Sequence, residues 1–61
     1  MSDDINFRLV LNTPKNPETA EKYDLWSLFL GDELLGWNLF EKGLPKKYVF
    51  RNLFKRYLEI L

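Results

Sequence analysis

The side chains that most often carry catalysis are missing from this chain, because its 61 residues include no histidine and no cysteine. The common nucleophile–base and acid–base pairs therefore cannot be assembled, and the usual ligands of zinc and haem are absent. Two adjacent carboxylate pairs remain, Asp3/Asp4 near the amino terminus and Asp32/Glu33 at a predicted turn, and we expect both to be solvated. The three glycines form no phosphate-binding motif. We expect no enzymatic activity, no metal site and no cofactor.

Clustered positive charge is the next chemical signal. The formal net charge is +0, but acidic residues dominate the first half and basic residues the last third. Lys47, Arg51 and Lys55 recur every fourth residue, with Lys46 and Arg56 beside them. Lysine and arginine next to aromatic residues can follow a phosphate backbone, so nucleic-acid binding is one candidate function. The ordinary alternative is the solvated basic face of an amphipathic helix, and a zero net charge weakens long-range attraction to nucleic acid.

The start of the last element breaks a local rule of helix chemistry. Pro45 suits a first helical position, yet Lys46 and Lys47 follow it where acidic residues are favoured, and Leu44 cannot cap. A phosphate or an acidic side chain could bind these N–H and ammonium groups together. The residues predicted to bind an anion are Lys46, Lys47, Arg51 and Lys55. Alternatively, Glu41 or Asp24 folds back to the same place.

Three elements follow from local patterns. Residues 5–12 alternate apolar and polar side chains, which predicts a strand with one buried face. Asn16 followed by Pro17 is typical of a helix start, which predicts a short helical turn near 17–22. Apolar residues recur at intervals of three and four after Pro45, which predicts an amphipathic helix near 45–60.

The central residues 23–40 hold both tryptophans and have two interpretations. Gly31-Asp32 suits a two-residue hairpin turn with glycine first, which gives strands at 23–30 and 33–40. Uninterrupted pairing from that turn places Trp26 opposite Trp37 on the face toward the C-terminal helix. The alternative is two helices, ended by Gly31 and Gly43. The hairpin is favoured because the apolar residues here spread around the whole helical wheel.

These elements predict an α+β fold: one domain with a small antiparallel three-stranded sheet and one long helix. A single helix covers only one face of such a sheet, so the other face is left apolar and exposed, as at an interface. The residues predicted to line this partner-binding face are Tyr23, Leu25, Phe29, Leu34 and Phe40.

The function favoured by the sequence is non-enzymatic protein binding. The apolar face predicts a homo-oligomer, docking onto another protein, or both, and a small bacterial or phage regulator or inhibitor that masks its partner fits this size. No segment has the apolar length of a membrane span, and the acidic start is unlike a signal peptide, so a cytoplasmic protein is expected.

Overall fold

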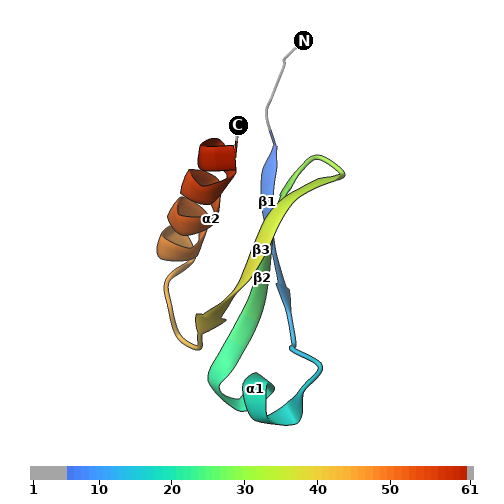
Figure 1. Ribbon diagram of the computed structural model, residues 1–61, viewed down its shortest axis with the longest axis vertical. Coiled ribbons are helices and arrows are strands. Elements are labelled where there is room, and N and C mark those ends of the chain that lie inside the picture. Colours follow the sequence, from blue (N-terminus) through green and yellow to red (C-terminus); the bar gives the residue numbers. More distant parts are fainter. Residues whose placement is uncertain (1–5, 61) are drawn as a thin grey trace.

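The chain forms a three-stranded antiparallel sheet with one long helix packed on a single face. The computed structural model describes residues 6–60, in the order β1 (Phe7–Asn12), α1 (Pro17–Lys22), β2 (Tyr23–Leu30), β3 (Glu33–Glu41) and α2 (Lys46–Ile60). The strand order is β1-β2-β3, so the longest strands are neighbours and β1 lies at one edge. Helix α1 lies at one end of the sheet, in the connection between β1 and β2 (Figure 1). The predicted α+β architecture is confirmed.

The hairpin interpretation of the central residues is confirmed, and the two-helix alternative is wrong. β2 and β3 pair directly, and the turn between them begins at Gly31, whose φ of 61° lies in the left-handed region. Asp32 does not share that conformation, so the turn has its positive φ at the first central position only, which is the pattern that favours glycine there.

The short helix α1 is capped as its sequence predicts. Asn16 has an extended backbone, and its Oδ1 accepts hydrogen bonds from the N–H groups of Glu18 (2.9 Å) and Thr19 (3.3 Å). Pro17, which has no N–H to satisfy, stands directly after the cap. Helix α1 therefore reverses the chain between β1 and β2 within a few residues.

A β-bulge changes which residues of β3 face α2. Pairing starts at the turn with Leu30 opposite Glu33 and Phe29 opposite Leu34, but Leu28 lies opposite Gly36, so Leu35 is the extra residue. A shift of one residue exchanges the two faces of a strand. The predicted pairing of Trp26 with Trp37 is therefore wrong: Trp26 lies opposite Asn38, and Trp37 lies opposite Ser27 on the other face.

The hydrophobic core lies between this sheet and α2. Its buried residues are Trp26, Leu28, Phe40, Val49 and Leu53. Val49 and Leu53 come from the face of α2 that the sequence predicts to be buried, and α2 packs mainly over β2 and β3. On the β1 side, the ring of Phe7 meets the rings of Phe50 and Phe54 edge to face, with centroids 5.7 and 5.3 Å apart. Residue 5 of the predicted first strand and Leu61 lie outside the described residues.

Candidate functional site

The sheet face opposite α2 is the larger of two candidate binding surfaces. We call it the outer face. Alternation along the strands and the pairing register place the following residues on it: Arg8, Val10, Tyr23, Leu25, Ser27, Phe29, Leu34, Trp37 and Leu39. Figure 1 shows α2 on one side of the sheet and no helix across the other. Among the described residues, nothing covers this face.

The exposure of its large side chains makes the outer face unusual for a domain of this size. Trp37 is 60% exposed, Leu34 50%, Leu39 40% and Tyr23 38%. Leu25 and Phe29 are half-buried beneath these neighbours, and the small Ser27 at the centre is buried. Scattered exposed apolar residues are normal, but several of them adjoining on one sheet face are typical of an interface.

One predicted member of this surface is wrong. Phe40 is only 6% exposed and belongs to the core under α2, because the bulge at Leu35 turns its side chain to the sheet face that α2 covers. The same bulge moves Trp37 and Leu39 outward, where uninterrupted pairing did not place them. Gly36 was the sequence signal for this, since an isolated glycine inside a strand pattern often marks a bulge. Tyr23, Leu25, Phe29 and Leu34 lie on the outer face as predicted.

Arg8 lies at the end of the outer face next to the hairpin turn. The guanidinium carbon of Arg8 lies 5.1 Å from the centroid of the Phe29 ring, within the range of a cation–π contact. Its Nη2 also donates a 3.0 Å hydrogen bond to the carbonyl oxygen of Gly31 in the hairpin turn. Arg8 thus links β1 both to the Phe29 ring on β2 and to the hairpin turn.

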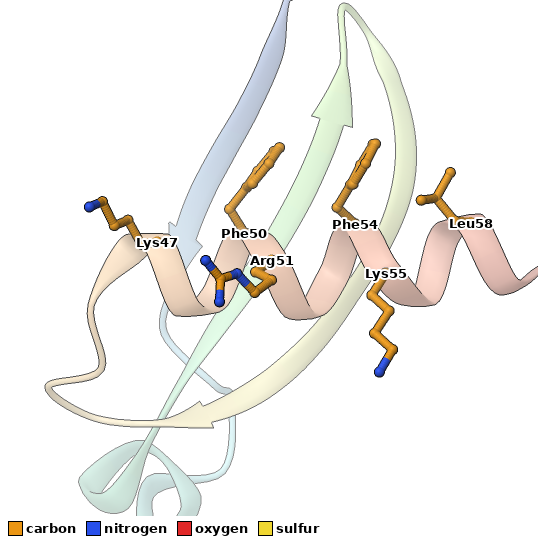
Figure 2. A pocket seen from close by; sticks show the side chains of 6 residues that line it. All are labelled: Lys47, Phe50, Arg51, Phe54, Lys55 and Leu58. Carbon is orange, nitrogen blue, oxygen red and sulfur yellow. The ribbon is translucent and has the colours of Figure 1, made fainter.

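The second candidate surface is a groove along α2. Its volume is about 590 Å³, and its lining comes from one helix (Figure 2): Lys47, Phe50, Arg51, Phe54, Lys55 and Leu58. The apolar members recur every fourth residue along one side, and the basic members recur every fourth residue along the other. The Phe50 and Phe54 rings are nearly parallel, with an interplanar angle of 9° and centroids 5.5 Å apart. We call this feature the α2 groove.

The predicted anion-binding residues divide between the α2 groove and the start of α2. Lys47, Arg51 and Lys55 line the groove, whereas Lys46 does not. The helix starts at Lys46, with the Pro45 carbonyl oxygen accepting from the N–H groups of Tyr48 and Val49, and its first turn has no acidic residue. Asp24 does not fold back to that end, because its carboxylate binds the ammonium group of Lys42 at 3.2 Å.

No described part of the chain offers a metal site or a membrane-spanning helix. Within residues 6–60, no group of three or more potential ligands gathers in a way that could hold a metal ion. None of the helices described there is long and apolar enough to cross a membrane. What the geometry does present is two surfaces suited to contact with other molecules, one apolar and one mixed apolar and basic. In comparisons with known proteins, no family model, curated protein or solved structure matches the chain.

Proposed function

We propose that the chain is a non-enzymatic protein-binding module that acts through its outer face. The observation that carries this proposal is the group of adjoining exposed residues there, above all Trp37, Leu34 and Leu39. A small regulator or inhibitor that masks a partner protein would use such a surface. Because two open apolar sheet faces can pack against each other, as they do in β-sandwiches, a homodimer of two facing sheets is the first partner that we expect.

The energy available for that dimer is modest. At about 200 Å² per large side chain, the exposed fractions of Tyr23, Leu34, Trp37 and Leu39 leave roughly 400 Å² of apolar area per copy in water. If half of this area is buried in a dimer, both copies together gain about 10 kcal/mol. Association itself costs about 4–15 kcal/mol. This leaves at most about 6 kcal/mol for the dimer, so we expect a weak association with a Kd between tens of micromolar and about 1 mM.

Sedimentation over a wide concentration range tests the dimer. Wild-type protein should gain mass as its concentration rises, and Trp37→Lys should stay monomeric at the same concentrations. Trp37 is preferable to Phe29 for this test, because a lysine at 29 would also lie beside Arg8 and destabilise the monomer. Ile60→Lys is the matched control: it removes an exposed apolar residue from the end of α2, which lies on the other side of the sheet from the outer face, and should dimerise like the wild type.

Two results would remove this proposal. Wild-type protein that remains monomeric at several millimolar excludes the outer-face dimer. If Trp37→Lys leaves the dimer intact and Ile60→Lys abolishes it, the interface is on α2 and not on the outer face. Thermal unfolding of both variants in dilute solution separates a lost interface from a lost fold.

Nucleic-acid binding along α2 is the alternative function. The observation that favours it is the row of Lys47, Arg51 and Lys55 beside the stacked rings of Phe50 and Phe54, since bases stack on aromatic side chains and phosphates bind basic ones. Binding of a single-stranded oligonucleotide would then weaken steeply as salt is raised, whereas docking on the outer face would change little. Pull-downs from a lysate with and without nuclease would distinguish the two modes.

A further inference from the structure

The outer edge of β1 is an unpaired edge of the sheet, beside the α2 groove. The Asn6 carbonyl oxygen accepts a 3.0 Å hydrogen bond from Gly31 N–H, and the register runs from there without interruption along β1. Because bonded pairs alternate in an antiparallel ladder, Arg8, Val10 and Asn12 bond to β2. The N–H and C=O groups of the intervening residues point away from the sheet, and these residues are Phe7, Leu9 and Leu11. No described residue pairs with them.

The side chains of those same three residues face the helix side of the sheet. Phe7 contacts Phe50 and Phe54, which line the α2 groove, and Leu9 packs against the core. Leu11, on the same side of β1, is 54% exposed. Since α2 packs mainly over β2 and β3, its aromatic residues beside β1, Phe50 and Phe54, are only half-buried. A strand added next to β1 would therefore find both backbone partners and an apolar surface for its side chains.

We propose that this edge and the α2 groove together bind an extended, acidic segment of a partner protein, which adds to β1 as a fourth strand. The charge of the groove decides the chemistry of the occupant. Lys47, Arg51 and Lys55 line it, and no acidic residue does. The segment would place apolar side chains against Phe50 and Phe54 and carboxylates next to the basic row. This site is separate from the outer face, so the proposal goes beyond the dimer described above.

A second copy of the chain is a poor occupant of this edge. Antiparallel pairing of β1 with the β1 of another copy, around a two-fold axis, leaves both α2 helices on the same face of the joined sheet. Both copies would then bring Lys47, Arg51 and Lys55 to the same face of the joined sheet, and this concentration of like charge disfavours the pairing. The opposite edge of the sheet is also less suitable for an acidic strand, because β3 has the bulge at Leu35 and acidic residues at both ends.

A pair of blocked heptapeptides tests the proposal on the intact chain. ETLTLTE presents two leucines flanked by two carboxylates on one face of a strand, and KTLTLTK differs only in the sign of its charges. We expect ETLTLTE to bind and KTLTLTK to bind at least tenfold more weakly. Each end of the peptide changes from an attractive to a repulsive charge contact, and each such change weakens binding by about the energy of one ion pair. In the bound state the outward amides of Leu9 and Leu11 should shift and exchange more slowly with solvent.

Two matched pairs of variants locate the contact. Leu11→Pro removes an outward-pointing N–H, which an edge strand tolerates, and should weaken ETLTLTE binding about tenfold relative to Leu11→Ala. Arg51→Glu should weaken it about fivefold, whereas Arg56→Glu, an exposed arginine of α2 that does not line the groove, should leave it unchanged. Each variant is first checked for its fold by amide spectra.

Several results would overturn the proposal. The first is the absence of any amide shift in β1 at about 1 mM ETLTLTE. We choose this concentration because it equals the largest Kd that such a contact would have. Binding that Leu11→Pro leaves unchanged excludes strand addition. Equal losses of affinity for Arg51→Glu and Arg56→Glu exclude the groove as the binding site.

Two further results would identify a different occupant. If an oligothymidine binds, loses affinity in Arg51→Glu, and ETLTLTE does not bind, the groove is a nucleic-acid site. If Leu11→Pro abolishes self-association while Trp37→Lys does not, a second copy occupies this edge. The outer-face dimer is tested by Trp37→Lys alone, so either proposal can fail without the other.

Discussion

The two tryptophans report on opposite faces of one sheet, and replacing them one at a time tests the register of the hairpin. Trp26 is 7% exposed in the core under α2, whereas Trp37 is 60% exposed on the outer face. Trp26→Ala empties a buried site and should lower the free energy of unfolding by about 3–5 kcal/mol. A domain of this length has a stability of about 3–9 kcal/mol in total. Trp26→Ala should therefore be largely unfolded or only marginally folded.

Trp37→Ala should have a much smaller effect. With 60% of its surface already in water, Trp37 buries about 80 Å² in the monomer, and its removal should cost about 1–2 kcal/mol. The comparison is made by urea denaturation in dilute solution, where a weak dimer is dissociated. At high concentration the difference between the two variants should shrink, because Trp37 also contributes to the proposed interface.

Fluorescence of single-tryptophan variants gives an independent check that does not depend on stability. Trp26→Phe leaves Trp37 as the only tryptophan, and its emission should be red-shifted and readily quenched by iodide. Trp37→Phe leaves Trp26, whose emission should be blue-shifted and protected from the quencher. Equal quenching of the two proteins, or equal loss of stability in the two alanine variants in dilute solution, would refute the bulged register and favour uninterrupted pairing.

Three further substitutions test local features of the fold by thermal or urea unfolding. Asn16→Ala removes the oxygen that caps α1 and should lower the free energy of unfolding by about 1 kcal/mol, whereas Asn16→Asp should nearly restore it. Gly31→Ala places a β-carbon on a residue with a φ of 61° and should cost about 1–2 kcal/mol, and an equally stable variant would contradict the turn geometry. Lys46→Glu puts an acid in the first turn of α2 and should raise the free energy of unfolding by about 0.6–2 kcal/mol. A loss of stability in this last variant would mean that the charge at this helix end is already compensated.

The sequence predicted the elements well because each carries its own local signal. Asn16-Pro17 marks the start of α1, Gly31-Asp32 marks the hairpin turn, and the apolar spacing after Pro45 marks α2. These signals act within a few residues and do not depend on the rest of the fold. For this reason the predicted and observed boundaries agree within about two residues, which is the usual uncertainty of helix ends.

The outer face was harder to predict because its membership depends on a single extra residue in β3. Leu34 and Leu35 are adjacent and equally apolar, so alternation alone does not say which of them faces the core. Placing Leu35 in a bulge lets both it and Phe40 pack toward α2, a gain that only the assembled tertiary structure reveals. Whether Phe50 and Phe54 line an open groove or a closed core depends likewise on which strands α2 covers. The spacing of these two residues along the helix does not predict which strands those are.

The reversed charges of α2 have a consequence for the order in which the chain folds. With two lysines at its start and Glu59 in its last turn, α2 opposes its own dipole at both ends and is a poor helix in isolation. The hairpin of β2 and β3 needs only a two-residue loop, so its contacts are local in sequence and form early. We therefore expect helix α2 to gain its structure late, by docking on a sheet that already exists. Substitutions that strengthen the ends of α2 should accordingly slow unfolding and leave the folding rate nearly unchanged.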